Sequence, residues 1–587
     1  MKPKTTGVRR LRVARDGRGR LLRSLLALLA LLCIACIAEA SPRRPHAAPT
    51  APAGSGGAAV LAAPPDTTAD QRIVVHRNVG DGAEVRVSVG IPFAPGALRD
   101  TSLLRILDAK GEEVPSHVQV TLRWYARDHS IRAVRVQFLA RLQGSEGTYY
   151  FAVGKPRTRE ADGWPYAQEL LADAQGVKVA AALATLEPTW LCASLVAGPQ
   201  SPATRDEAYA HYVSTQFDWA RKLPADDFSA WLFDRPSTLF KAYVRTGRFD
   251  YLQAADQSYH FYMGYIKRDG LPFSPFCAGG WTYDKKPCDV KYVYTESILL
   301  ALALTGDDSE HDAALVDKMV TLWQHGGWAG TPGPYANPGE HFTERQAGLG
   351  LLATVNAYEL TGDLRYLRFT RERVDWLYEH QRANPDKLGD DGSWRNSWNL
   401  HENDDWHPER DVRGSSPWMS ENIIDGLWHS WLVTGDKRIP AMITAFGRYM
   451  ERYGWIDVKA IKQSRDWRNP CSGPNGQIAW YWSSSQASFD KLADIEDSDG
   501  WYSDAHNVEL AMPVAAAYYF ETDPAQSAAL KRRLDALESS YSTECAQVTG
   551  TLRRFNWNNR GAGVAMWFRQ QPAGSGATSS MAGHAMP

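Results

Sequence analysis

The sequence contains few of the residues that mark metal-binding or disulfide-rich proteins. Cysteine occurs 7 times among 587 residues, and the single Cys-x-x-Cys pair, Cys33 with Cys36, lies inside an N-terminal apolar run. Neither a His-Glu-x-x-His sequence nor a Cys-His zinc spacing is present. We therefore predict a protein that uses no metal and no other cofactor.

An excess of positive charge is also missing. The formal net charge is −2, and it becomes about −9 when residues 1–40 are excluded, because that segment is rich in Lys and Arg and poor in acids. Phosphate backbones bind to basic surfaces. We therefore expect no nucleic-acid partner.

The sequence also lacks long apolar runs. The run from Leu25 to Ile37 is shorter than the roughly 20 residues that a membrane-spanning helix needs. It follows a Lys/Arg-rich segment, residues 1–23, and ends before Ala38-Glu39-Ala40. This pattern predicts a secretory signal peptide over residues 1–40 and a secreted or periplasmic protein without a stable membrane span after cleavage. Cys36 leaves a lipoprotein as the alternative.

The remaining chain divides by composition. Residues 41–70 and 571–587 are rich in Pro, Ala, Gly and Ser, which predicts a flexible linker and a disordered tail. Residues 71–157 alternate apolar and polar positions between Gly and Pro turns, which indicates five or six antiparallel strands in a β-barrel or sandwich. Residues 158–202 are read as an interdomain connection and residues 203–570 as the catalytic domain.

The pattern of residues 203–570 predicts paired helices. Residues 347–360 are apolar on nearly every side, whereas residues 363–383 carry one apolar stripe. Thr361-Gly362-Asp363 lies between them and provides a glycine C-cap and an aspartate N-cap, and similar Thr-Gly steps recur along the domain. The expected helices lie at 203–222, 229–245, 249–266, 292–304, 308–325, 343–360, 363–383, 419–433, 436–453, 506–520, 524–540 and 560–570.

These twelve helices alternate between half-buried and buried types. Six apolar helices shielded by six amphipathic ones predict an (α/α)6 toroid, so the whole chain is α+β and multidomain. The long connections precede the apolar helices and must emerge at one mouth of the ring, where functional loops are expected. Cys277 and Cys288 bracket one of these connections, and we expect a disulfide between them.

The candidate site residues come from this mouth. The candidate catalytic residues are His341, Tyr294, Arg345, Glu344, Glu421 and His401. The candidate substrate-binding residues are Trp281, Trp328, Tyr335, Trp398, Trp406, Trp418, Asn422, Trp482, Trp501, His506 and Glu509. Aromatic rings suit the apolar face of a sugar, but they also anchor loops. Acids in a first helical turn are favoured by the helix dipole alone, by about 0.3–1 kcal/mol, so a structural interpretation stays open for each glutamate.

One segment resembles a known family. It includes Gly90-Ile91-Pro92-Phe93-Ala94-Pro95-Gly96-Ala97-Leu98, Leu103-Leu104-Arg105-Ile106-Leu107-Asp108, Glu113-Val114-Pro115 and Asp128-His129-Ser130-Ile131-Arg132. It resembles the N-terminal β-barrel of exo-rhamnogalacturonan lyase-like proteins, in which that barrel precedes an (α/α) toroid acting on acidic pectic polysaccharide. His129 stands where the family pattern has glycine, and no counterpart of the family's later β-domain is found.

The resemblance implies a polysaccharide substrate, and two reactions suit the mouth. A lyase cleaving uronate-containing glycan by β-elimination needs a group that neutralises the carboxylate (Arg345 or Asn422), a base (His341 or His401) and a proton donor (Tyr294). A glycoside hydrolase needs paired carboxyls instead, such as Glu344 with Glu421. The lyase is the leading hypothesis, the hydrolase is the second, and a non-catalytic glycan-binding protein is the third. The sequence leaves the glycan and the oligomeric state open.

Overall fold

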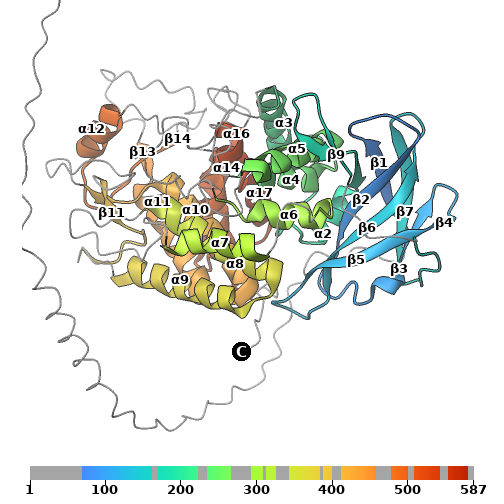
Figure 1. Cartoon of the computed structure of the whole chain (residues 1–587). Helices are drawn as coiled ribbons and strands as arrows, with labels where there is room; N and C mark the ends of the chain where they lie inside the picture. The colour runs from blue at the N-terminus through green and yellow to red at the C-terminus, as the bar shows by residue number, and fades with distance from the viewer. Residues whose placement is uncertain are drawn as a thin grey trace, which may run out of the picture. The chain divides into compact units, whose positions relative to one another are not determined.

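The computed structural model describes residues 69–161, 169–222, 234–265, 293–307, 313–325, 343–383, 388–398, 412–457, 477–499, 508–541 and 553–578. All of them belong to one compact unit, from Ala58 to Pro587. The described chain is α+β: antiparallel sheets come first and a helical region follows (Figure 1). No described helix combines the length and the apolar composition that a membrane crossing requires.

The N-terminal strands form two main antiparallel sheets. The five-stranded sheet has the order β10-β1-β7-β3-β4, with strands β1 (Gln71–Arg77), β3 (Leu104–Asp108), β4 (Glu113–Val114), β7 (Glu146–Val153) and β10 (Ala182–Leu186). The three-stranded sheet has the order β2-β6-β5, with β2 (Glu84–Pro92), β5 (Ser116–Arg123) and β6 (Ile131–Arg141). A small hairpin pairs β8 (Leu170–Ala172) with β9 (Lys178–Ala180). The described strands form no closed barrel.

The two sheets bury alternate side chains between them. Ile73 and Val75 on β1 are fully buried, as the alternating pattern predicts. Across the sheets, the rings of Phe138 on β6 and Tyr149 on β7 lie 4.9 Å apart. His129, where the family pattern has glycine, takes a positive φ of 56°. The histidine therefore adopts the left-handed conformation that glycine favours.

Regular structure is found in the segment expected to be an interdomain connection and in the segment expected to be a disordered tail. Strand β10 falls within the expected connection 158–202 and pairs with β1, Val75 opposite Ala184. Because β10 is buried on both faces, it lacks the alternation that marks a strand. At the other end, the segment expected as a tail from 571 contains the 3-10 helix η8 (Ser575–Thr578), where Gly576 packs against Phe520.

Every one of the twelve predicted helices is present. They are α3 (Ala208–Ala220), α4 (Arg235–Thr246), α5 (Phe249–Tyr265), α6 (Glu296–Leu304), α7 (Ala313–His325), α8 (Glu344–Thr361), α9 (Leu364–Ala383), α10 (Pro417–Thr434), α11 (Arg438–Tyr453), α13 (Ala511–Phe520), α14 (Pro524–Ser540) and α17 (Ala562–Gln570). Elements that were not predicted are α2 (Pro188–Ala193), α12 (Phe489–Asp499), α16 (Arg553–Asn559), η1 (Thr101–Leu103) and the short strands β11 (Asn396–Ser397), β12 (Arg413–Gly414), β13 (Trp455–Asp457) and β14 (Gln477–Ala479).

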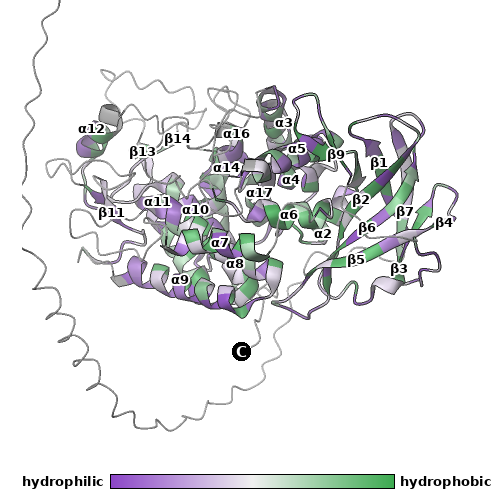
Figure 2. Ribbon diagram, in the orientation of Figure 1, coloured by the Kyte–Doolittle hydropathy of each residue, from purple (hydrophilic) through white to green (hydrophobic). Residues whose placement is uncertain are grey.

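The predicted alternation of buried and half-buried helices is also observed. Helix α6 is buried along its whole length, whereas α9 buries Leu367, Val374 and Leu377 and exposes Arg365 and Arg368. Figure 2 shows α6 as mostly hydrophobic and α9 with both colours. The buried helices contact one another in succession: α4 with α6, α6 with α8, α8 with α10, α10 with α13, α13 with α17, and α17 with α4.

A repeated turn ends four of the buried helices. Gly247, Gly306, Gly362 and Gly435 all take φ between 63° and 70°, the left-handed conformation that the Thr-Gly pattern predicts. In the example at Gly362, Thr361 Oγ1 donates to the Ala357 carbonyl (2.7 Å) and accepts from the Asp363 N–H (3.1 Å). The threonine hydroxyl thus partners backbone groups at a helix end.

The β-sheets contact the helices at this turn end. Strands β2 and β6 contact α6, and β5 contacts α8. Arg132 on β6 forms a 2.6 Å ion pair with Glu359 in the last turn of α8, and Gly362 lies directly against the Tyr125 ring. The opposite, N-terminal ends of the buried helices are therefore the ends that face away from the sheets.

Candidate functional site

A pocket lies among the buried helices, toward their N-terminal ends. It is lined by the start of α4, the start of α6, one face of α8 and the turn between α16 and α17. Its lining residues are Asp234, Val293, Tyr294, Thr295, Glu296, Leu349, Leu352, Ala353, Asn356 and Arg560. We call it the central pocket. Apolar walls with a few converging polar groups are typical of a ligand site.

Asp234 is the N-cap residue of α4. Its carboxylate accepts from the Ser237 N–H at 3.1 Å, and Pro236 follows in the first turn. Its backbone is left-handed, with φ 56° and ψ 71°, a conformation that costs a non-glycine residue energy and that clusters at functional sites. Burial, together with the negative charge of Glu296, raises the pKa of Asp234 to about 7. Asp234 can therefore exchange a proton near neutral pH.

Glu296 begins α6 and lies opposite a lysine. Lys241 Nζ on α4 is 2.7 Å from Glu296 Oε1, and both side chains are buried. His429 Nε2 on α10 lies 3.8 Å from the same oxygen and 3.6 Å from Asp425 Oδ1. Burial lowers the pKa of His429, which favours the neutral imidazole. Lys241 is therefore the positively charged partner of Glu296 in this buried pair.

Arg560 joins the pocket to α10. Its guanidinium contacts Glu421 Oε2 at 2.8 Å, Asn422 Oδ1 at 3.0 Å and Asp425 Oδ2 at 3.1 Å. Glu421 and Asp425 are one turn apart on α10, so both face the same arginine. Arg560 is 3% exposed, and buried charges of this kind are tolerated only with such partners.

The surroundings of the two carboxyls of α10 move their pKa values in opposite directions. Burial raises the pKa of Glu421 to about 8, and the charges of Asp425 and Glu509 add to this effect against the opposing charge of Arg560. Burial also opposes the ionisation of Asp425, but Arg560 and Lys241 hold the pKa of Asp425 below its ordinary value. At neutral pH the pair therefore carries one proton, mainly on Glu421.

The central cluster has more acids than bases. Among the described residues of this cluster, Asp234, Glu296, Glu421 and Asp425 are four carboxyls, whereas Lys241 and Arg560 supply two positive charges. Ionising all four groups would leave two uncompensated negative charges away from water, which is strongly unfavourable. The cluster therefore holds protons at neutral pH.

Glu344 anchors a second polar group, between the starts of α8 and α10. Its Oε1 accepts from the Ser416 N–H at 2.8 Å and from Ser415 Oγ at 3.0 Å. Burial raises the pKa of Glu344 to about 7. The neighbouring Arg345 guanidinium lies 5.9 Å from the Trp418 ring. Glu344 thus ties the segment before α10 to α8.

The predicted tryptophans in the described chain are buried. Trp398, Trp418 and Trp482 are 3%, 2% and 0% exposed. Trp418 stacks on Trp557 at 5.4 Å, and Trp398 lies edge-on to Trp482 at 5.4 Å. Their faces contact one another instead of solvent, so in this structure these rings anchor the loops.

The structure brings some of the predicted site residues together. Tyr294 lines the central pocket, Glu421 and Asn422 contact Arg560, and Glu509 is close enough to influence the pKa of Glu421. Ten further predicted residues lie outside the described ranges: His341, His401, Trp281, Trp328, Tyr335, Trp406, Trp501, His506, Cys277 and Cys288.

Sequence reasoning missed much of the central cluster. The members that were not among the candidate residues are Asp234, Lys241, Glu296, Asp425, His429 and Arg560. One signal was available, because Glu421, Asp425 and His429 recur every four residues in a helix that is buried over nearly its whole length. Such a polar stripe within a buried helix needs partners inside the protein.

Comparison with known proteins adds no family. No protein-family model matches the chain, and no curated protein matches it significantly. Within the described ranges, no three His, Cys, Asp or Glu residues are arranged to hold a metal ion. The functional argument therefore depends on the geometry and charge of the central pocket.

Proposed function

We propose that this chain is an exported glycan-cleaving enzyme whose central pocket performs general acid–base catalysis. The supporting observation is the surplus of buried carboxyls, since two of them, Asp234 and Glu421, have pKa values near or above neutrality. Carboxyls whose environments push their pKa values apart are characteristic of acid–base sites. Export is proposed from residues 1–40 alone.

The proposed scaffold is an (α/α)6 toroid. The cyclic contacts of α4, α6, α8, α10, α13 and α17 support a closed inner ring. In such a ring the N-terminal ends of the inner helices share one mouth, and the central pocket lies toward these ends. A ring also explains why residues as distant as Lys241 and Arg560 belong to one cluster.

Hydrolysis is the reaction that the pocket favours. Asp234, whose pKa is raised, can donate a proton to the leaving oxygen, and Glu296, 2.7 Å from Lys241, provides the second carboxyl. A protonated acid and an ionised carboxylate are the two groups that glycoside hydrolysis needs.

The second candidate is the predicted lyase, acting on rhamnogalacturonan or a pectin-like glycan by β-elimination. Its support is that Tyr294, the predicted proton donor, lines the same pocket, together with the resemblance of the N-terminal strands to the lyase-like family. Here the surplus protons of the cluster would offset the charge of the uronate.

Product analysis distinguishes the candidates. The purified mature chain is incubated with neutral plant glycans and with pectic polysaccharides. New reducing ends without ultraviolet absorbance indicate hydrolysis, and unsaturated products that absorb in the ultraviolet indicate elimination. Affinity without either product would identify a binding protein and overturn the proposal of an enzyme.

Asp234→Asn tests the assigned acid. Asparagine keeps the N-cap oxygen and tolerates the left-handed backbone, so folding is retained while the exchangeable proton is lost. We expect the rate of glycan cleavage to fall by about 10²–10⁴-fold. The matched control is Asp363→Asn, a partly exposed residue between α8 and α9 whose carboxylate accepts from the Arg365 N–H. Equal activity of the two variants would contradict the role of Asp234.

A further inference from the structure

His429 lies between the central cluster and a second pocket. Its Nε2 is 3.6 Å from Asp425 Oδ1 and 3.8 Å from Glu296 Oε1. This nitrogen is fully buried, whereas 8% of the histidine side chain is exposed. The exposed surface therefore belongs to a different part of the side chain from the nitrogen that faces the carboxyls.

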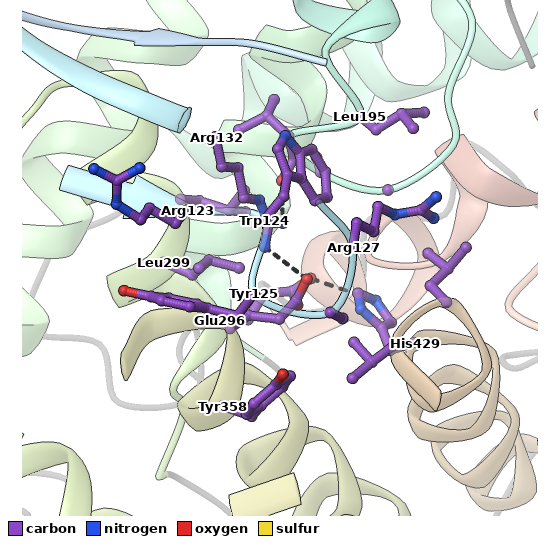
Figure 3. Close-up of a pocket in the computed structure, with 18 of the residues that line it drawn as sticks. Arg123, Trp124, Tyr125, Arg127, Arg132, Leu195, Glu296, Leu299, Tyr358 and His429 are labelled. Carbon is purple, nitrogen blue, oxygen red and sulfur yellow. Dashed lines mark hydrogen bonds and ion pairs between the residues drawn. The ribbon is translucent and has the colours of Figure 1, made fainter. Parts of the chain in front are cut away.

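The second pocket lies where the β-sheets meet the turn ends of the buried helices, and we call it the sheet-side pocket. It encloses about 670 Å³, part of it open to solvent. Its walls are the turn 123–127 after β5, the segment 195–199 and the sides of α6, α8 and α10. Arg127 in this lining is partly exposed, and Figure 3 shows His429 on the side of the helices. Solvent can therefore approach His429 from the side of the sheets.

Glu421, Asp425 and His429 form one row along α10. They recur every four residues, so each lies one turn from the next on the same face of the helix. Arg560 holds the first two together, at 2.8 Å from Glu421 Oε2 and 3.1 Å from Asp425 Oδ2. Glu421 carries the proton of this pair at neutral pH, and His429 lines the sheet-side pocket. The row therefore connects a buried proton with a pocket that reaches solvent.

A neutral histidine at the end of this row can pass a proton on, because imidazole accepts at one ring nitrogen and donates at the other. Burial lowers the pKa of His429, and Lys241 on α4 acts in the same direction. The negative charges of Asp425, Glu296 and Glu359, on α10, α6 and α8, oppose this effect without reversing it. The ring is therefore mainly neutral at neutral pH, so it holds an extra proton only transiently.

We propose that His429 relays protons between the central cluster and solvent in the sheet-side pocket. When the cluster releases a proton, Glu421 passes it to Asp425, and Asp425 passes it to His429 Nε2. The proton on His429 Nδ1 then goes to water, which leaves a neutral histidine protonated on Nε2 and one more negative charge on the carboxyls. Uptake follows the reverse order. The 3.6 Å between Asp425 and His429 must shorten to about 3.2 Å or less during each transfer.

The relay rests on the proposed function in one respect, since it supplies the carboxyls to which we assigned acid–base catalysis. It can nevertheless be measured without a glycan, by infrared spectroscopy after a rapid pH jump. The full mature chain is mixed from about pH 7 to about pH 9, and the loss of the protonated-carboxyl band is followed in time. We expect this band to decay about tenfold or more slowly in His429→Gln than in the parent chain, because glutamine does not take up a proton.

The equilibrium spectrum separates a relay from a structural role. The pH at which the band is lost should be the same in His429→Gln and in the parent chain, because a relay changes the rate and not the end state. Ala197→Phe is the second variant. Ala197 is buried in the lining of the sheet-side pocket, so phenylalanine fills that pocket, leaves the row on α10 intact and should also slow the decay.

The matched control is His380→Gln. His380 on α9 is buried as well, its Nε2 lies 3.0 Å from the Arg395 carbonyl oxygen, and it does not line the sheet-side pocket. The control should lose the band at the rate of the parent chain.

A parent-like decay in His429→Gln or in Ala197→Phe overturns the relay, and so does equal slowing in His380→Gln. A parent chain without the band at neutral pH overturns both the relay and the proposed acid–base cluster. A relay that behaves as expected in a chain that cleaves no glycan overturns only the proposed enzyme.

Discussion

The buried helices α4, α6, α8 and α10 end alike but begin differently. Their C-terminal ends share one threonine–glycine turn, with matching left-handed glycines and threonine hydroxyls that bond to the backbone. Toward the opposite ends and along the inner faces they carry different charged groups, among them Asp234, Glu296 and Glu421. Repetition at one end is typical of a structural role, and variety at the other is typical of a site.

The two ends of the buried helices also differ in how their charged side chains are paired. At the turn end, Asp363 pairs with Arg365, and Asp436 pairs with Arg438, on partly exposed surface. In the described part of the interior, Arg560 and Lys241 are fewer than the acids that surround them. Exposed pairs contribute little to stability, whereas an imbalance away from water is costly. A protein maintains such an imbalance where it serves chemistry.

The largest expected effect on stability is that of Arg560→Met. The substitution leaves Glu421 and Asp425 buried without their cation, so the free energy of unfolding should fall by about 3–5 kcal/mol. Arg438→Met, a partly exposed partner of Asp436 and Asp375, should cost only about 0–1 kcal/mol. Urea denaturation measures both. Similar losses for the two variants would remove the contrast between the two ends.

A smaller effect is expected in the pH dependence of stability. The pKa of Glu344 is about 7 in the folded protein, against an ordinary value of 4.5. Between these values the folded chain binds more protons than the unfolded chain, so stability falls as pH rises through this window and is level above it. The Glu344→Gln variant does not lose stability in this window. Above about pH 7 its free energy of unfolding should therefore exceed that of the parent chain by up to about 3 kcal/mol.

Denaturation midpoints measured between about pH 4 and about pH 8 test this behaviour. The control is Glu372→Gln, an exposed position on α9, which should keep the slope of the parent chain. A Glu344→Gln variant whose stability changes with pH in parallel with the parent would show that Glu344 ionises normally.

The smallest expected effect concerns the shared turn. An alanine Cβ at Gly362 would lie 2.7 Å from the Tyr125 ring, whereas at Gly389, also at positive φ, it would meet nothing within 4 Å. Both substitutions put a residue with a Cβ where the backbone is left-handed, so each should lower the free energy of unfolding by about 1–2 kcal/mol. We expect Gly362→Ala to cost about 1 kcal/mol more than Gly389→Ala, from overpacking. Thermal unfolding measures the difference, and equal losses would mean that the sheets do not press on the turn.

Local patterns accounted for most of the fold. The twelve helices follow from apolar periodicity, and the turn at Gly362 follows from three adjacent residues. Strand β10 was missed because burial on both faces removes its alternation. Helices α12 and α16 were missed because they lie inside connections that were expected to be loops.

The candidate site was less predictable because it depends on which helix faces meet. Tyr294, Glu421 and Asn422 were recognised from their places at helix starts. Lys241 and Arg560 carry no local signal, since the partners of each are 55 and about 140 positions away in the chain. Only the tertiary contacts among the buried helices show that carboxyls outnumber cations among the described residues of the cluster.

The most direct test of the central claim is infrared difference spectroscopy of protonated carboxyl groups. The spectrum of the parent chain is compared with that of the Asp234→Asn, Glu421→Gln double variant, from about pH 5 to about pH 9. We predict a protonated-carboxyl band at neutral pH that disappears as pH rises past about 8 and that is reduced in the variant. A neutral-pH spectrum without this band, or with one that the double variant leaves unchanged, would contradict the account.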